Sequence, residues 1–201
     1  MTTVDAAALK VALKDALNFT DRRVREFGVV RLRTTDTHLV VSATDRYVFT
    51  RLRVPAQDPE PMDVCVGYDD IKTLVLPLLS TGSVSLTRKA DRVLLGVFTA
   101  TLPLLTTEPP PALVRGEQKL FSFSFDEEGA SMAAFTIDLI RKLPRRDGAR
   151  SLAHMFHVGK STVWFDASPE RRWVVLVAPA RVPDNPADAF FDHNDTWKDL
   201  S

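Results

Sequence analysis

The sequence has few of the residues that hold small proteins together covalently. Its 201 residues include one cysteine, Cys65, which lies inside the apolar run Val64-Cys65-Val66. One cysteine excludes a disulfide framework or a cysteine metal site within one chain, and its apolar neighbours predict a buried strand thiol rather than a reactive nucleophile. Because 45% of the residues are hydrophobic, the chain can bury a core without such staples.

Targeting and membrane signals are also missing from the sequence. The N-terminal residues contain no basic segment followed by an apolar one, and no run of 18 consecutive apolar residues occurs. These absences predict a cytoplasmic protein with no membrane partner.

Catalytic signatures are the third absence. The four histidines show no HExxH or comparable ligand spacing, and the chain has no Gly-rich phosphate loop and no Gly-x-Ser-x-Gly elbow. His154 and His157 would point to opposite faces of a strand, which disfavours a shared metal. Asp45, between two predicted strands, is expected to form a turn. The sequence therefore predicts no enzyme, no metal and no cofactor.

Charge is balanced overall but unevenly distributed. Lys+Arg and Asp+Glu each number 26, yet basic residues are concentrated in residues 10–33 and 141–150. Residues 184–201 contain five aspartates and only one lysine, Lys198. Solvated helix faces explain the basic clusters in one interpretation, and a nucleic-acid surface explains them in the other.

Hydrophobic periodicity predicts one structural unit three times. The apolar stripe of Leu9, Leu13 and Leu17 predicts a helix capped by Thr3 or Asp5. Pro77 is expected to kink or shorten the second helix. The helices should begin near residues 5, 69 and 131, followed each time by three strands: 27–34, 38–44 and 46–54; 83–89, 92–98 and 99–105; and 152–159, 162–167 and 172–182. Leading strands are expected at 62–67 and 119–126.

This spacing of roughly 62 to 64 residues, with the same β-α-β-β-β order, indicates an internal repeat. It predicts an α+β fold of antiparallel sheets with amphipathic helices on one face. The expected organisation is a domain of two units at 1–107, a Pro-rich linker at 108–118, a third unit or half domain at 119–183, and an acidic tail at 184–201.

Two segments resemble the bacterial sliding clamp, the β subunit of DNA polymerase III. Val41-Ser42-Ala43-Thr44-Asp45-Arg46-Tyr47-Val48-Phe49 is similar to the strand pair of that family in which Ala-Thr-Asp precedes a Gly or Arg. Trp173-Val174-Val175-Leu176-Val177-Ala178-Pro179-Ala180-Arg181 is similar to its last strand, which closes on Val-Met-Pro-Met-Arg. The resemblance covers about residues 1 to 183.

The resemblance implies a DNA-clamp fold, with helices lining a hole for duplex DNA and sheets outside. Such a protein is a tether for DNA replication, a processivity factor that contacts phosphates without reading bases. The implied DNA-binding residues are Lys10, Lys14, Arg22, Arg23, Arg141, Lys142, Arg145 and Arg146.

The resemblance also implies a pocket for a short apolar peptide of a DNA polymerase or clamp loader. Its residues here would be Thr44, Arg46, Tyr47, Phe49, Val177, Ala178, Pro179, Ala180 and Arg181. Val48 replaces the usual Arg of the family, and Ala178 and Ala180 replace two flexible methionines. A working pocket and an altered or lost one are both compatible with these replacements.

Three units do not make whole two-unit domains, so ring closure would require several chains. A homo-oligomeric DNA tether is therefore one hypothesis, and a clamp-fold adaptor that binds only proteins is the alternative. In the tail, Phe190-Phe191 either packs under the last sheet as a latch or docks in a clamp pocket like a partner peptide.

Overall fold

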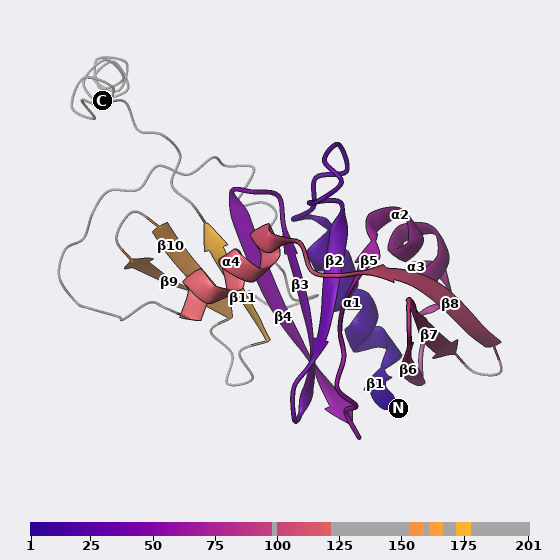
Figure 1. Ribbon diagram of the computed structural model, residues 1–201. Helices are drawn as coiled ribbons and strands as arrows, with labels where there is room; N and C mark the ends of the chain where they lie inside the picture. The colour runs from indigo at the N-terminus through magenta and orange to yellow at the C-terminus, as the bar shows by residue number, and fades with distance from the viewer. Residues whose placement is uncertain (98–99, 122–152, 159–160, 167–171, 178–201) are drawn as a thin grey trace, which may run out of the picture.

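A computed structural model describes residues 1–97, 100–121, 153–158, 161–166 and 172–177 (Figure 1). The strands are β1 (Thr2–Asp5), β2 (Val29–Thr34), β3 (His38–Thr44), β4 (Val48–Gln57), β5 (Asp63–Gly67), β6 (Ser83–Lys89), β7 (Arg92–Val97), β8 (Ala100–Thr107), β9 (Ala153–Val158), β10 (Ser161–Asp166) and β11 (Trp173–Val177). The helical segments are α1 (Ala6–Leu17), α2 (Tyr68–Asp70), the π-helical turn η1 (Ile71–Val75), α3 (Leu76–Leu78) and α4 (Pro111–Phe121).

Helix α1 forms where the apolar stripe predicted it. The side chain of Asp5 caps its first turn by accepting a hydrogen bond from the backbone N–H of Ala8 at 2.8 Å. Leu9 and Leu13, one turn apart, are both buried. The prediction of an amphipathic helix at the start of the chain is confirmed.

The second helical segment runs without a break from Tyr68 to Leu78, but it is irregular. The π-helical turn η1 lies immediately before α3, which contains Pro77. Because proline has no backbone N–H, an ordinary helical ladder cannot pass through this position. The sequence predicted both the helix and its disturbance at Pro77.

The pairing pattern of the sheet confirms the repeat for the first two units, whose elements all lie in the described residues. Every pairing in the described part of the chain is antiparallel, and the strand order is β1-β6-β7-β8-β5-β2-β3-β4-β11-β10-β9. Strand β1 also pairs with β4, so β1 to β8 form a closed circuit. The first strand of each unit pairs with a strand of the other unit: β1 pairs with β6, and β5 pairs with β2.

The main apolar core gathers residues of α1, of the second helical segment and of both halves of the circuit. Among its largest fully buried side chains are Leu9, Leu13, Leu39, Ile71 and Leu95. Burying side chains of this size contributes about 1.5 to 3 kcal/mol each relative to exposure. The predicted α+β fold with antiparallel strands is thus confirmed.

Helix α4 corrects two expectations. Residues 108–118 were expected to be a linker and 119–126 a strand, yet Pro111–Phe121 is helical. Proline is compatible with the first turn of a helix, and Leu113 and Glu117, four residues apart, share the face that becomes buried. The prolines at the start of this segment favoured a linker, so the helical spacing of Leu113 and Glu117 was not interpreted as a helix.

The position of α4 also changes the arrangement of helices. Successive residues of β4 point to opposite faces of the sheet, so Phe49 and Leu52, three positions apart, point in opposite directions. Leu52 belongs to the main core with α1, whereas Phe49 packs with Leu113 of α4. Helix α4 therefore lies on the sheet face opposite α1, across β3 and β4 (Figure 1). Helices cover both faces of this sheet, not one. We call the face under α4 the outer face.

Other expectations concern the ends of the chain. Strand β1 was missed, because four residues are too few to show a clear alternation. The helix expected at 131–143 lies outside the described residues. Within the described ranges, no helix is both long and apolar enough to span a membrane.

Candidate functional site

The turn between β3 and β4 carries the clamp-like Ala-Thr-Asp motif, and its backbone is tightly held. The hydroxyl of Thr44 donates to the carbonyl of Val48 at 2.7 Å. A carboxylate oxygen of Asp45 accepts from the N–H groups of Tyr47 at 3.1 Å and Val48 at 2.9 Å. Asp45 is thus the turn-former that the sequence predicted.

The motif presents two side chains to solvent. Arg46 adopts a positive φ of 85°, which explains why glycine is favoured at this position of such a turn, and its guanidinium lies 5.0 Å from the centre of the Phe27 ring. Tyr47 is 64% exposed. Thr44 and Phe49 are buried, and Phe49 points to the outer face under α4. Of the four pocket residues predicted in this segment, Arg46 and Tyr47 are thus exposed.

Strand β11 brings the second predicted element to this turn. Its register on β4 runs from Trp173 opposite Leu52 to Val177 opposite Val48. The C-terminal end of β11 therefore lies beside the residue that follows the turn. The remaining pocket residues, Ala178, Pro179, Ala180 and Arg181, lie outside the described residues.

The predicted DNA-binding residues that the structure describes lie around α1 and the second helical segment. The ammonium group of Lys10 donates to the carbonyl of Leu79 at 2.6 Å, next to the end of α3. Arg22 contacts the beginning of the same helical segment, with an ion pair to Asp69 at 3.1 Å and its guanidinium 4.9 Å from the centre of the Tyr68 ring. Lys10 and Arg22 therefore lie on the helix side of the molecule.

The structure describes two of the remaining predicted DNA-binding residues. Lys14 and Arg23 are exposed on α1 and on the loop after it. Arg141, Lys142, Arg145 and Arg146 lie outside the described residues. The helix side also exposes Val11, Leu74 and Leu78, each between 42% and 50%.

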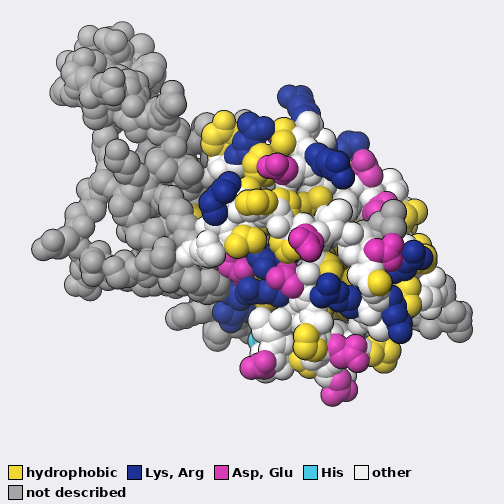
Figure 2. Space-filling model, in the orientation of Figure 1, with side chains coloured by type: hydrophobic (Ala, Val, Ile, Leu, Met, Phe, Trp, Pro, Cys, Tyr) yellow, Lys and Arg dark blue, Asp and Glu magenta, His cyan; other side chains and the backbone are white. Residues whose placement is uncertain are grey.

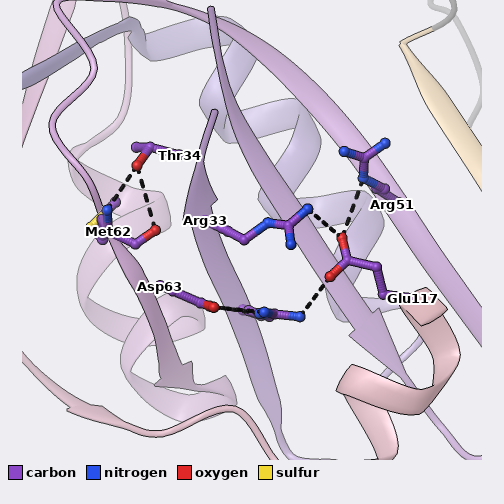
Figure 3. A network of polar contacts seen from close by, with 7 residues as sticks. Arg33, Thr34, Arg51, Met62, Asp63 and Glu117 are labelled. Atoms are coloured by element: carbon purple, nitrogen blue, oxygen red, sulfur yellow. Dashed lines mark hydrogen bonds and ion pairs between the residues drawn. The ribbon is translucent and has the colours of Figure 1, made fainter. Parts of the chain in front are cut away.

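A network of charged side chains, which no sequence motif had indicated, lies between α4 and the outer face (Figure 3). Arg31 forms a two-pronged contact with Asp63, in which both oxygens accept at 2.6 Å. It also donates to Glu117 of α4 at 2.8 Å. The hydrogen bond to Asp63 raises the pKa of Arg31, against the opposing effect of burial.

Glu117 is the carboxylate at the centre of this network. It also forms an ion pair with Arg33, in which the nearest nitrogen and oxygen are 2.7 Å apart, and it lies 3.6 Å from Nε of Arg51. Burial lowers the pKa of Arg51, and the neighbouring charges of Arg53 and Arg33 add to this effect, whereas Glu117 opposes it. Both Arg51 and Glu117 are buried. One carboxylate of α4 thus faces three guanidinium groups.

Apolar contacts hold α4 at the same place. Leu113 packs with Phe49, Cys65, Val163 and Leu176, so the helix contacts both the first circuit and the third unit. Gly116 permits this closeness, because a Cβ added there would lie 2.7 Å from a ring carbon of Phe49. Helix α4 therefore bridges the seam between β4 and β11 on the outer face.

Part of this network could have been found in the sequence. Arg31 and Arg33, like Arg51 and Arg53, are two residues apart in predicted strands and so share a face. Their partner Glu117 was hidden, because its segment was assigned to a linker. Among the described residues, no group of three His, Cys, Asp or Glu side chains could hold a metal ion.

The comparisons with known proteins agree with this architecture of repeated units, closed circuit and third unit on β4. No family model and no curated protein matches the sequence. Solved structures do match. The DNA polymerase sliding clamp from Pseudomonas aeruginosa aligns with a TM-score of 0.66 at 12% identity, over 94% of this chain and 67% of that one.

Two further structures give the same result. The Helicobacter pylori β clamp bound to DNA ligase peptide aligns with a TM-score of 0.68 at 10% identity, over 90% of this chain and 67% of that one. The β subunit of DNA polymerase from Streptococcus pyogenes aligns with a TM-score of 0.66 at 9% identity, over 91% and 66%. The chain has the fold of the bacterial sliding clamp and aligns with about two thirds of each of these clamp chains.

Proposed function

We propose that the protein is a non-catalytic, clamp-like processivity factor that tethers a replication protein to duplex DNA. The observation that supports this best is the register that sets Val177 of β11 beside Val48 of β4. This register places the end of β11 beside the turn that exposes Arg46 and Tyr47, so both elements of the proposed docking place come from one chain. A peptide of a DNA polymerase or clamp loader would dock there.

The helix side would contact DNA through basic side chains. Lys14 and Arg23 are exposed there, and Lys10 and Arg22 lie nearby. Lysine and arginine contacts with phosphates do not depend on base sequence, weaken with salt and permit sliding. Three units do not make whole two-unit domains, so we propose a homo-oligomer as the form that surrounds DNA.

Retention on circular DNA tests the tether. The protein should stay on a nicked circular duplex during gel filtration and leave when the circle is cut, because a clamp slides off free ends. Lys14→Glu with Arg23→Glu should lower duplex affinity and reduce the log-log salt slope by about 0.9 for each phosphate that is no longer neutralised. The matched control is Arg88→Glu with Lys89→Glu in the β6–β7 hairpin. Retention unaffected by cutting the circle contradicts a tether.

Peptide capture tests the second half of the proposal. A labelled peptide ending in paired apolar residues should bind, and Tyr47→Ala should weaken binding by about 1 to 3 kcal/mol, since exposed aromatic residues often anchor such contacts. Lys89→Ala, at an exposed position of the β6–β7 hairpin, serves as control. Equal binding by Tyr47→Ala and the wild type would exclude the turn as the docking place.

A second candidate is a clamp-fold adaptor that binds proteins only. The exposed apolar residues Val11, Leu74 and Leu78 favour it, because they lie on the side that would otherwise face DNA. An adaptor would capture the peptide but would show neither ring-like mass nor retention on circles. Light scattering after gel filtration, combined with the retention assay, separates the two functions.

A further inference from the structure

The turn between β3 and β4 presents an aromatic ring and a guanidinium next to each other in the sequence. Tyr47 is 64% exposed, and Arg46 is exposed with its guanidinium 5.0 Å from the centre of the Phe27 ring. In Figure 2, hydrophobic and basic side chains lie side by side toward the top of the molecule, where Figure 1 shows this turn. Such a surface favours a ligand that combines aromatic rings with carboxylates.

The backbone beneath these two side chains is already ordered. The hydroxyl of Thr44 donates to the carbonyl of Val48, and a carboxylate oxygen of Asp45 accepts from the N–H groups of Tyr47 and Val48, at distances between 2.7 and 3.1 Å. A surface that is fixed before binding loses little conformational entropy when a ligand docks. The turn is therefore a preorganised docking surface.

A segment with the matching chemistry follows β11 in the same chain. The acidic tail, residues 184–201, contains five aspartates and one lysine, together with the adjacent pair Phe190-Phe191. Asp188 and Asp192 flank that pair. Adjacent phenylalanines gain free energy by leaving water, whereas an aspartate leaves water without a penalty only beside a cation or a hydrogen-bond donor. A surface that offers both a ring and a guanidinium meets both requirements.

The register of β11 brings the start of this segment close to the turn. Val177, where β11 ends, pairs with Val48, which directly follows Tyr47. Phe190 comes thirteen positions after Val177, and a chain of that length can span up to about 40 Å. The turn is well within this reach, and so short a connection gives the tail a local concentration on the order of millimolar.

We propose that the acidic tail docks on the turn of its own chain, with Phe190-Phe191 against Tyr47 and a flanking aspartate paired with Arg46. This inference rests on the proposed function, because the tail then occupies the place proposed for the partner peptide. The tail is an internal competitor, so only the molecules whose turn is unoccupied capture a peptide. Partners that bind strongly enough to displace the tail are thereby selected over weaker peptides.

Photo-cross-linking tests the docking without any partner peptide. The full chain carries p-benzoylphenylalanine, a photoreactive ring, in place of Phe191, and mass spectrometry locates the cross-links. They should concentrate on the turn around Tyr47 within one chain, at a yield that dilution does not change. Tyr47→Ala should lower the yield about threefold, whereas Lys89→Ala, in the exposed β6–β7 hairpin, should not. Cross-links mainly on β9 to β11, on the helix side or between chains would overturn the proposal.

Peptide affinity measures the competition. With the labelled peptide that ends in paired apolar residues, Phe190→Ala with Phe191→Ala should bind about tenfold more tightly than the wild type, because the tail no longer occupies the turn. Trp197→Ala, which removes another aromatic residue of the tail, is the matched control and should leave the affinity unchanged. In a chain with Tyr47→Ala, the paired change should give no gain, since the tail and the peptide have lost the same anchor.

The two measurements separate a failed tail contact from a failed partner function. Equal peptide affinity of the wild type and the Phe190→Ala, Phe191→Ala variant overturns the proposal and leaves peptide capture intact. Cross-links to the turn without peptide binding by either chain support the tail contact and remove the partner peptide instead. Absence of both cross-links and peptide binding overturns both.

Discussion

Strands β4 and β8 occupy the same position in the two units of the first circuit, yet the edges that face away from β3 and β7 are paired differently. Each is the last strand of its unit, and each pairs at its C-terminal end with a leading strand, β4 with β1 and β8 with β5. The N-terminal half of β4 pairs with β11, and α4 covers that seam. The corresponding half of β8 pairs only with β7 in the described part of the chain.

Proline distinguishes the two edges. Pro103, in the open half of β8, lies opposite Leu94 of β7. Because proline has no N–H to donate, its nitrogen must face away from β7, toward the open edge. That edge lacks one donor and accepts an added strand less well, as natural sheet edges often do. Strand β4 has no proline in the stretch that pairs with β11.

The largest expected effect comes from a change in α4, which covers the seam between β4 and β11. Glu117→Ala removes the carboxylate that faces Arg31, Arg33 and Arg51. Leaving buried charges without their partner should lower the free energy of unfolding by about 3 to 5 kcal/mol, measured by urea denaturation. Gln118→Ala, at the next and exposed position, should change it by less than about 0.5 kcal/mol. Similar decreases in both variants would mean that Glu117 does not hold α4.

A smaller effect is expected from crowding the same part of α4. Gly116→Val should push against Phe49 and lower the free energy of unfolding by about 1 to 3 kcal/mol. It should also speed the reaction of Cys65 with a thiol reagent, since Cys65 packs with Leu113 under α4. Arg115→Val, on the exposed side of α4, controls for the helix propensity of valine. Unchanged labelling of Cys65 would show that α4 keeps its place despite the added bulk.

The edge of β8 beside Pro103 can be made more able to pair with another strand. Pro103→Thr restores a backbone donor at the edge of β8 and should strengthen self-association there, with little change in the stability of the single chain. The weight-average mass from light scattering should rise at lower protein concentration than for the wild type. Pro61→Thr, in an exposed loop, should not have this effect. Equal masses for Pro103→Thr and the wild type would remove proline as the reason that the edge is open.

The smallest effect on stability at neutral pH is expected from the ionisation of the Cys65 thiol. Burial raises the pKa of its thiol to about 12. The unfolded chain loses this proton near the ordinary thiol pKa, while the native chain keeps it up to about 12. The corresponding contribution to stability is therefore complete at neutral pH and declines as the pH rises through that window.

Native protein at pH 8 should accordingly react with iodoacetamide far more slowly than urea-unfolded protein. Cys65→Ala should show a shallower loss of stability between pH 9 and pH 11. Rapid labelling of the native chain would indicate that the cover formed by α4 opens often.

The sequence predicted the elements with local signals. Leu9 and Leu13 set the period of α1, the alternation along 38–54 set β3 and β4, and Asp45 marked the turn between them. Strand β1 was too short for such a signal, and Pro109-Pro110-Pro111 concealed the start of α4. For the candidate site, the Ala-Thr-Asp turn was predicted, but the burial of Phe49 under a helix was not, because that depends on a segment more than sixty residues away.

The sequence alone therefore determined the repeated α+β unit, its antiparallel strands, the buried thiol and the clamp-like turn, since each depends on residues close together in the chain. Only the tertiary structure decided which strand edge is covered, which arginines share a carboxylate, and where α4 lies. Those outcomes depend on pairs such as Arg31 with Glu117 and Val177 with Val48, whose partners are far apart in the sequence. No local pattern of hydrophobicity or charge specifies such pairs, because each residue type has many possible partners and packing selects among them.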